Sequence, residues 1–425
     1  MPRRSFTRAQ WITLFAIWAT YASFYFCRVN IGPARSSIER SLSLDPIEVG
    51  LVLGSLKIGY AIGQLLGGQA AERFGSKRIL MIAMFGSVAM TVSFALAPLL
   101  LNAYGVTHTY LVRTLIALWF CNGVFQAGGW PSSVKIMSRW FSAAERGRMM
   151  GVIGTGYQLS TALTLVGSGY LVSTTGDWRA SFWVPACMML AMTVFAAWLV
   201  RESPAAEDLP RGRLSIPPPK LAPLETLRIT LANPAIWVLA IGLFGLNITR
   251  YGFLDWAPGH LEKTQAGGIA GSTLKIAVFP VAGAIGALSS GWLSDRLFQA
   301  KRAPVIVIML IVVGIASAGY GRALTLGPFA IVSCLAIVGF ALYGAQVLLV
   351  GTAAQDFAKK EASAAAAGFI DFFGYLGAFS GDAITGFLLK HHGYEQALQL
   401  WTAAPLVAAV VVALLWNRRA EAASA

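Results

Sequence analysis

The sequence predicts an all-α membrane protein with twelve transmembrane helices, arranged as two pseudo-symmetric halves of six helices each. Composition gives the first reason, because 56% of the 425 residues are hydrophobic and only 12% are charged, with a mean hydropathy of +0.64. The second reason is that apolar runs long enough to cross a bilayer recur along the whole chain, with one substantial polar break at 201–228. The third is that two features repeat at an offset of about 222 residues, which indicates a duplicated unit.

The helices are expected where the apolar runs lie. Their expected ranges are 11–37, 47–71, 79–101, 109–137, 146–172, 180–200, 233–259, 271–294, 304–321, 328–354, 362–389 and 396–416. The chain then divides into an N-terminal half at 1–200 and a C-terminal half at 231–425. Residues 201–230 are interpreted as a cytoplasmic linker, because this segment is polar and mixes Pro, Arg and Leu.

The positive charge of the chain follows membrane topology. A formal net charge of +14 would suit a nucleic-acid-binding protein, but 21 of the 33 Lys and Arg residues fall in loops on the side of the N-terminus. Seven lie in loops on the opposite side, and five lie within predicted helices. This asymmetry follows the positive-inside rule and predicts that both termini are cytoplasmic. We therefore expect a multi-pass protein of the cell's inner (plasma) membrane. Its expected partner is the lipid bilayer, and we expect it to bind no nucleic acid.

Two arginines inside predicted helices are the strongest functional signal. Arg28 lies in the first helix and Arg250 in the seventh, so each half supplies one. A charge at this depth is costly and usually faces the interior of the bundle or an aqueous cavity. A guanidinium keeps its proton and presents a planar fork of donors that matches phosphate or carboxylate. Two of them between the halves would clamp one dianion, and reorientation of the empty protein would be slow, which predicts exchange of one anion for another.

Further polar side chains share helix faces in a way that favours a cavity wall. Tyr21 and Tyr25 lie on the same face of the first helix as Arg28, which favours a cavity over tyrosines that face lipid. The second and fourth helices have comparable faces. Their members are Lys57, Tyr60 and Gln64 in the second helix and Gln126 and Trp130 in the fourth.

The second repeated feature is a charged loop after the second and eighth helices. The loops contain Glu72 and Arg73 in one half and Asp295 and Arg296 in the other. An acid at one helix end with basic residues just beyond it can hold the cytoplasmic ends of neighbouring helices together. We therefore interpret both as cytoplasmic gating loops. Both resemble the loop signature of the major facilitator superfamily, which implies the major facilitator fold.

Segments throughout the chain resemble the organophosphate:phosphate antiporters of that superfamily, which include bacterial glycerol-3-phosphate and hexose-phosphate transporters. The segments are Tyr25–Arg28, Phe125–Pro131, Trp140–Gly147, Arg250–Pro258 and Gly374–Gly377. The resemblance implies a monomeric secondary active transporter that exchanges an organophosphate or related organic phosphorus anion for inorganic phosphate by rocker-switch alternating access. It assigns phosphate binding to Arg28 and Arg250. It also implies a pocket that contains Tyr21, Tyr25, Tyr60, Gln126, Trp130, Tyr343 and Tyr375.

The chain differs from this family at positions that are expected to contact the organic group of the substrate. Gln64 stands where the family commonly has Lys, Tyr157 where the glycerol-phosphate members have His, and Asn247 where they have Tyr. We expect these three side chains to line the altered part of the pocket. Lys57 lies two turns from Gln64 on the same helix face, so one hypothesis is that Lys57 replaces the missing cation.

Asp371 is an acid inside the eleventh predicted helix. It could be the structural partner of a buried cation such as Lys57, Arg250 or Lys275. It could instead handle a proton or read a cationic group on the substrate, as in a phosphorylated amine or an aminophosphonate. The sequence leaves these alternatives open.

Enzyme chemistry has little support in the sequence. The four His fall in outward loops or helix ends, and there is neither a phosphate-cradling Gly-rich loop with Lys nor a metal-ligand cluster. We therefore expect no cofactor and no metal. Two other functions stay open. One is proton-coupled symport of an organic carboxylate, which an acid such as Asp371 would suit. The other is a transporter-like sensor of sugar phosphates, as known for one member of the hexose-phosphate branch.

Overall fold

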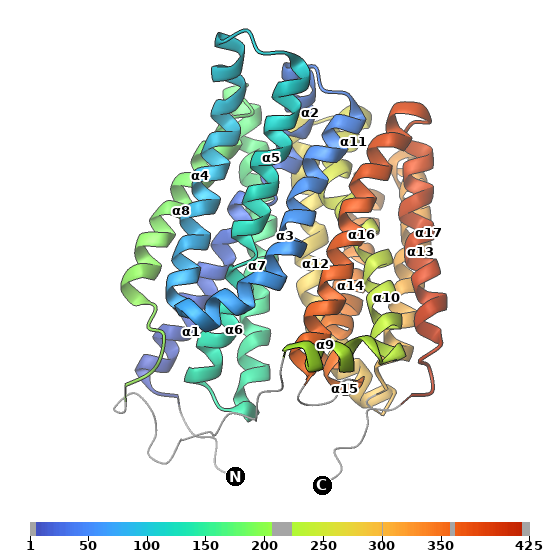
Figure 1. Cartoon of the computed structure of the whole chain (residues 1–425). Helices are drawn as coiled ribbons and strands as arrows, with labels where there is room; N and C mark the ends of the chain where they lie inside the picture. Colours follow the sequence, from blue (N-terminus) through green and yellow to red (C-terminus); the bar gives the residue numbers. More distant parts are fainter. Residues whose placement is uncertain (1–5, 206–222, 300, 358–361, 419–425) are drawn as a thin grey trace.

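The computed structural model describes residues 6–205, 223–299, 301–357 and 362–418. All regular structure in these ranges is helical, and the long helices run side by side through the molecule (Figure 1). Eleven helical spans of the described residues are long and apolar enough to cross a membrane. A further helix of 33 residues, α7 (Ala143–Thr175), lies among them and is richer in Gly, Ser and Thr. The prediction of an all-α membrane protein is confirmed.

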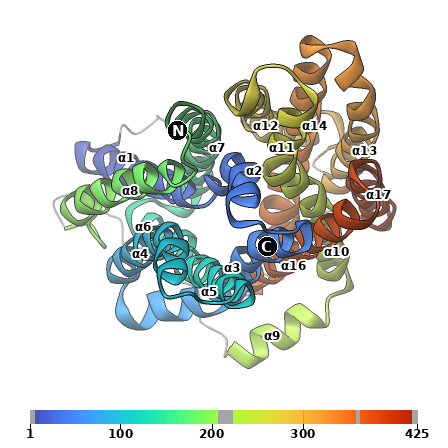
Figure 2. The ribbon, with the colours of Figure 1, turned by 90° about the horizontal axis from the view of Figure 1, so that it is seen from above.

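The N-terminal part of the chain contains the first nine helical elements. They are α1 (Arg8–Ser23), the 3-10 helix η1 (Phe24–Cys27), α2 (Ile31–Leu42), α3 (Pro46–Phe74), α4 (Ser76–Ala103), α5 (His108–Gln126), α6 (Gly129–Trp140), α7 and α8 (Ala180–Leu199). A short helix, α9 (Pro223–Leu231), follows inside the segment predicted as a linker. Figure 2 shows α9 at the outer rim of the molecule.

The C-terminal part continues the same organisation. Its elements are α10 (Pro234–Tyr251), the π-helix η3 (Gly252–Trp256), α11 (Ala257–Thr264), α12 (Gly268–Leu297), α13 (Arg302–Leu326), α14 (Pro328–Val347), the π-helix η4 (Leu348–Thr352), α15 (Ala353–Phe357), α16 (Ser363–His391) and α17 (Tyr394–Ala413). Elements α1 to α8 occupy one side of the molecule and α10 to α17 the other (Figure 1). Below, these are the N-terminal and the C-terminal bundle.

Four spans that the sequence predicts as single helices are interrupted. The first contains η1, the fourth breaks between α5 and α6, the seventh contains η3, and the tenth contains η4. A π-helical turn or a broken helix leaves backbone groups without their regular partners and is often found at functional sites. Arg28 directly follows η1, and Arg250 lies in the last turn of α10 before η3. Both arginines therefore lie next to irregular backbone, in corresponding spans of the two bundles.

Glycines allow one close helix contact in each bundle. A side chain on Gly59 or Gly123 would strike the backbone of the facing helix in the α3–α5 pair, at Phe120 and Leu56 respectively. In the other bundle, Gly286 and Gly339 play this part between α12 and α14. Small residues let helix backbones approach closely in membranes, where packing replaces the hydrophobic effect as the main attraction.

The two bundles contact each other through α3 with α16 and through α7 with α12. At the end of the molecule away from the termini, α2 also packs against η3 and α11, and Figure 2 shows α2 between the two bundles. Ion pairs join the bundles at this end. Arg40 contacts Glu262 at 3.2 Å, and Lys390 contacts Asp45 at 2.8 Å.

Candidate functional site

Arg28 is held in place by a buried network of neutral groups. Its Nε donates to Gln126 Oε1 at 2.8 Å, and Nη1 donates to the Tyr25 hydroxyl at 3.3 Å. Gln126 is fixed in turn because its Nε2 donates to the Phe24 carbonyl at 3.0 Å and to Ser87 Oγ at 2.8 Å. The second terminal nitrogen, Nη2, is buried without a hydrogen-bond partner. The protein therefore orients the guanidinium through Nε and Nη1, while Nη2 makes no hydrogen bond.

Arg250 is buried to the same degree and has even fewer partners. The side chains of Arg28 and Arg250 are 4% and 3% exposed. The Arg250 guanidinium lies 5.2 Å from the Tyr251 ring centre and 5.0 Å from that of Tyr343, and its Nε has no hydrogen-bond partner. In the part of the chain that the structure describes, no carboxylate lies within ion-pair distance of either arginine.

Six tyrosines connect the two arginines in a closed ring. On one side Arg28 stacks on Tyr25, which is followed by Tyr157 and Tyr343 on the way to Arg250. On the other side Arg28 stacks on Tyr60, which is followed by Tyr375 and Tyr251. The ring-to-ring distances are 5.2 Å for Tyr25–Tyr157, 6.4 Å for Tyr157–Tyr343, 4.3 Å for Tyr60–Tyr375 and 6.4 Å for Tyr251–Tyr375. The ring crosses between the bundles twice, at Tyr157–Tyr343 and at Tyr60–Tyr375. Aromatic faces attract cations without neutralising them, so the arginines keep their full charge.

Asp371 and Gln64 lie beside this arginine–tyrosine ring. Asp371 is half-buried on α16, and it is near enough to both Arg28 and Arg250 to interact electrostatically with them. Gln64 lies between Asp371 and Tyr60. The site therefore contains two cations and one nearby acid, Asp371, which forms an ion pair with neither arginine.

Three other expected pocket residues lie at or beyond the edge of the ring. Tyr21 contacts Tyr25 at 6.1 Å and Trp130 at 5.0 Å between ring centres, which makes Trp130 an outer neighbour. Asn247 is buried against Gly374 of α16, and its Oδ1 has no hydrogen-bond partner. The structure thus brings most of the expected residues together and places Asn247 in a helix contact.

Lys57 is placed differently from the hypothesis that it is a free substrate-binding cation. Its Nζ donates to Asp255 Oδ2 at 2.6 Å and to the Leu53 carbonyl at 3.0 Å, and it lies 2.7 Å from Asp382 Oδ2. All three charged side chains are buried. Lys57 is already surrounded by two carboxylates from the other bundle, so in this conformation it has no charge left over for a substrate.

The two loops interpreted as gating loops make different contacts in the two bundles. In the C-terminal bundle Asp295 pairs with Arg302, which also contacts Asp356 at 3.0 Å and so joins α12, α13 and α15. Arg296 instead stacks on Trp292 at 5.6 Å. In the N-terminal bundle Arg73 stacks on Phe74 at 5.4 Å, and the side chain of Glu72 lies outside the described residues.

Near the charged loop of the N-terminal bundle, another acid, Glu202, makes the polar contacts. Glu202 accepts from the Ser76 backbone N–H at 3.0 Å and from Arg139 at 2.8 Å. Burial opposes the charged form of Glu202, but these hydrogen bonds outweigh it and hold the pKa of the carboxyl below its ordinary value. Glu202 therefore joins α4 and α6 to the segment that follows α8.

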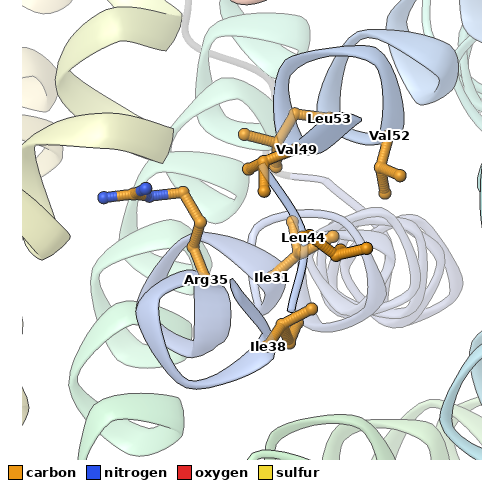
Figure 3. Close-up of a pocket in the computed structure, with 7 residues that line it drawn as sticks. All are labelled: Ile31, Arg35, Ile38, Leu44, Val49, Val52 and Leu53. Carbon is orange, nitrogen blue, oxygen red and sulfur yellow. The ribbon is translucent and has the colours of Figure 1, made fainter. Parts of the chain in front are cut away.

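A small apolar pocket between α2 and α3 is a weak candidate for a binding site. Six of its seven lining residues are aliphatic, and Figure 3 shows the Arg35 side chain extending away from them. That guanidinium already contacts Glu39 and the Tyr394 hydroxyl, both at 3.0 Å, and stacks on Trp256 at 4.8 Å. Among the described residues no group of His, Cys, Asp and Glu could hold a metal ion.

Sequence reasoning missed three participants. Tyr251 completes the tyrosine ring, and Asp255 and Asp382 bind Lys57. A signal for the first two existed, because both belong to the same segment as Arg250. Nothing in the sequence paired Asp382 with Lys57, since the two are 325 residues apart.

Comparison with known proteins identifies the family. Residues 17–381 match the Major Facilitator Superfamily. The chain belongs to this superfamily. It is therefore a multi-pass membrane protein of a family of transporters and not of enzymes. A bacterial homolog of the human lysosomal transporter Spinster, solved in an inward-facing and unoccupied conformation, superposes with a TM-score of 0.71 over 96% of each chain at 17% identity. That likeness confirms the predicted major facilitator fold.

Similar members of the superfamily confirm the resemblance to organophosphate transporters. The glycerol-3-phosphate transporter of Bacillus subtilis is 28% identical over 95% of this chain and 92% of its own length. The membrane sensor protein UhpC of Escherichia coli is 29% identical over 86% and 82%. A probable hexose phosphate transport protein of Chlamydia trachomatis is 24% identical over 95% and 90%.

Proposed function

We propose that this protein is a secondary active transporter that exchanges an organophosphate, or a related organic phosphorus anion, for inorganic phosphate by alternating access. The observation that carries the proposal is the pair of buried guanidinium groups, one from each bundle, with which no carboxylate of the described residues forms an ion pair. A phosphate dianion would supply the missing partner for both. The similarity to the glycerol-3-phosphate transporter of Bacillus subtilis supports the same substrate class.

The electrostatics of the arginine pair favour obligatory exchange. A buried charge without a partner costs several kcal/mol even after the protein relaxes, on the order of 3–5 kcal/mol when one partner of a buried pair is removed. The empty site holds two such charges at the junction of the bundles. A bound dianion offsets this cost and lets the bundles rearrange, whereas the empty protein reorients slowly.

The contacts between the bundles support a state that is closed away from the termini. From the tyrosine ring towards that end, α2 packs on η3 and α11, and the Arg40–Glu262 and Lys390–Asp45 pairs cross between the bundles. We assign both termini to the cytoplasm of a cell with this protein in its inner membrane, from the distribution of Lys and Arg. In this assignment the site opens inward, residues 201–230 link two pseudo-symmetric halves, and a single chain is sufficient for transport.

Phosphate counterflow tests this proposal. Proteoliposomes are loaded with unlabelled phosphate, labelled phosphate is added outside, and uptake is compared for the wild type, Arg28→Lys and Arg250→Lys. Lysine keeps the charge but loses the planar fork of donors. Because a hydrogen bond to a charged group contributes roughly 1.5–3 kcal/mol, we expect exchange to fall at least about tenfold in each variant.

Arg113→Lys is the matched control, since Arg113 is exposed on α5, and it should exchange like the wild type. Absence of exchange by well-folded wild-type protein would contradict the proposal. Proton-coupled uptake of an organic carboxylate would then be the next candidate to measure.

One observation favours a second function. The similarity to the membrane sensor protein UhpC extends over 86% of this chain, so a sensor of sugar phosphates built on the same site is an alternative. A sensor would bind phosphate esters without sustained counterflow. Binding measured by a ligand-induced rise in the melting temperature, together with absent exchange, would support this alternative.

A further inference from the structure

We propose that Lys57, Asp255 and Asp382 form a proton-binding site between the bundles, separate from the arginine–tyrosine ring. We further propose that this triad takes up one proton when the bundles separate at the end away from the termini. The inference rests on the alternating-access part of the proposed function and is independent of which anion is carried.

The first argument is the count of charges. Two carboxylates surround one ammonium group at 2.6 Å and 2.7 Å, and the side chains of Lys57, Asp255 and Asp382 are 4%, 4% and 0% exposed. With both acids ionised the triad carries one net negative charge in a place that water does not reach. In this closed arrangement the Lys57 ammonium offsets part of the negative charge. Once the bundles separate, the two carboxylates share a site without the ammonium, an arrangement in which one of them holds a proton readily.

The second argument is the hydrogen bonding of Asp382. Its Oδ1 accepts from the Trp256 indole N–H at 3.0 Å. Its Oδ2 lies 2.7 Å from Lys57 Nζ, as an ion pair outside hydrogen-bond geometry, while Nζ donates to Asp255 and to the Leu53 carbonyl. Buried polar atoms are rarely left without a hydrogen bond. Oδ2 is therefore the oxygen to which a proton can bind once the ammonium leaves.

The third argument is the distribution of the triad over the two bundles. Lys57 is on α3 of the N-terminal bundle, whereas Asp255 on η3 and Asp382 on α16 belong to the C-terminal bundle. Trp256 hydrogen-bonds Asp382 and directly follows Asp255, so the two acids stay together when the bundles move apart. Separation would remove the ammonium from two neighbouring carboxylates, and a proton would then take its place.

The surroundings connect the triad to the arginine site. Tyr251, whose ring is 4.8 Å from Lys57 Nζ, also lies beside Arg250. Beyond Tyr251 and Trp256, the further titratable and charged groups are Arg28, Arg35, Tyr60, Arg250, His260, Asp371 and Tyr375. Among the described residues neither Arg28 nor Arg250 forms an ion pair with the triad, so the two arginines favour its unprotonated form only through their long-range field. A dianion bound to Arg28 and Arg250 would cancel this field, so substrate binding and proton binding should favour each other.

The test compares counterflow of phosphate in the wild type and in Asp382→Asn over a range of pH. Asparagine keeps the acceptor for Trp256 and leaves a balanced Lys57–Asp255 pair that needs no proton. Because phosphate itself titrates, the quantity to follow is the ratio of the variant rate to the wild-type rate at each pH. We expect the ratio to approach one at acid pH and to rise at alkaline pH by about tenfold for each pH unit above the midpoint of the site.

Two further variants make the result interpretable. Asp255→Asn also leaves one balanced pair and should give the same ratio profile, so the proposal stays testable if Asp382→Asn fails to fold. Glu262→Gln breaks the half-exposed pair with Arg40 between the same bundles and should give a ratio to the wild type that does not change with pH. Flat ratios for both aspartate variants would overturn the proposal. A pH-dependent ratio for Glu262→Gln would also overturn it, because surface charge would then explain the effect.

A second measurement does not depend on phosphate transport. A Cβ on Gly169 of α7 would lie 2.8 Å from Thr273 Cβ of α12. This is shorter than the spacing of about 3.5–4.5 Å between the Cβ atoms of a disulfide, so two cysteines here are within bonding reach once the helices shift apart slightly. Gly169→Cys and Thr273→Cys are combined in a background with the four native cysteines replaced by Ser. Oxidative cross-linking without added phosphate then reports how often the bundles are closed at this end.

The cross-linking yield should rise more steeply with pH when Asp382 is present than when it is Asn. Thiolate formation also depends on pH, but it affects both proteins equally. A steeper rise without any phosphate counterflow would contradict the proposed antiport and uphold the triad. Identical yields in both proteins, with flat rate ratios, would reject the triad as a proton site even if phosphate exchange is robust.

Discussion

At the scale of single residues, the side chains that contact Arg28 and Arg250 carry no negative charge in the part of the chain that the structure describes. Arg28 and Arg250 are buried among tyrosine rings and amide groups, which orient the guanidinium groups without neutralising them. Tyrosine faces and the Gln126 carbonyl oxygen contribute attraction on the order of 1–2 kcal/mol each. An anion can displace this modest stabilisation, whereas it could not readily displace a carboxylate. Binding of phosphate and release of phosphate are therefore both feasible.

Asp371 allows a prediction about the organic group of the substrate. It lies near both arginines without pairing with either, so it would attract a cationic group carried by a bound phosphate ester. We expect Asp371→Asn to lose preference for a phosphorylated amine by roughly tenfold, the effect of about 1.4 kcal/mol. The measurement is inhibition of labelled-phosphate counterflow by phosphoethanolamine and by glycerol 3-phosphate. Inhibition by glycerol 3-phosphate serves as the control, and an unchanged ratio between the two inhibitors would assign Asp371 a structural role.

At the scale of helices, the same devices recur in both bundles. The first and seventh spans are irregular where each arginine projects, and the fourth and tenth spans are irregular as well. The α3–α5 and α12–α14 pairs both approach through glycines. Close backbone contact fixes one face of each pair, so the irregular spans keep a defined position around the ring.

The glycine contacts predict a stability difference. Gly123→Val would drive two methyl groups into the backbone of α3 near Leu56, and overpacking a tight contact costs about 1–3 kcal/mol. We expect a lower melting temperature in detergent and less monodisperse protein. Gly319→Val on α13 is the control, because a side chain at Gly319 meets no atom within 4 Å. Equal melting temperatures for the two variants would show that α3 and α5 can separate without loss.

At the scale of the whole molecule, the contacts between the bundles decide which end is closed. Buried contacts near the ring and ion pairs nearer the surface act together at the end away from the termini. Surface pairs contribute little on their own, typically less than about 1 kcal/mol. Their weakness suits the proposed alternating access, in which the bundles would separate at this end during each cycle.

The Asp45–Lys390 pair gives a pH prediction at this scale. Burial opposes ionisation of Asp45, but hydrogen bonds from Lys390 and from the Glu48 and Ile47 N–H groups outweigh it and lower the pKa of its carboxyl. A lowered pKa means that this stabilisation is present above the ordinary value and is lost as the pH falls through the pKa of the folded protein. Asp45→Asn keeps the helix cap and loses the charge.

We therefore expect Asp45→Asn to lower the melting temperature slightly at neutral pH and to match the wild type once the pH falls below the lowered pKa of Asp45 in the folded protein, where the aspartate is protonated in both states. Lys390→Gln should have an effect of equal size, and the double variant should be no less stable than either single one. A difference between Asp45→Asn and the wild type that stays constant down to the lowest pH would contradict the assignment of the effect to this charge pair.

Sequence alone determined the features of this protein that depend on local, additive properties. The cost of placing polar groups in lipid predicted the helical spans and the importance of Arg28 and Arg250. Helical periodicity predicted that Tyr25 and Tyr60 would face the same interior. The division at 201–230 remains a prediction of this kind, since residues 206–222 lie outside the described part of the chain.

Tertiary structure alone decided which side chains meet across the bundles. Lys57 and Gln64 share a helix face, yet Lys57 turns to Asp255 and Asp382, which are 198 and 325 residues away in sequence. Tyr251 joins the ring and Asn247 does not, although both flank Arg250. The physical reason is that a buried charge pairs with the opposite charge that the packing of other helices brings close to it. Helical periodicity predicts which face of a helix a side chain lies on, but it does not predict which residue of another helix will contact it.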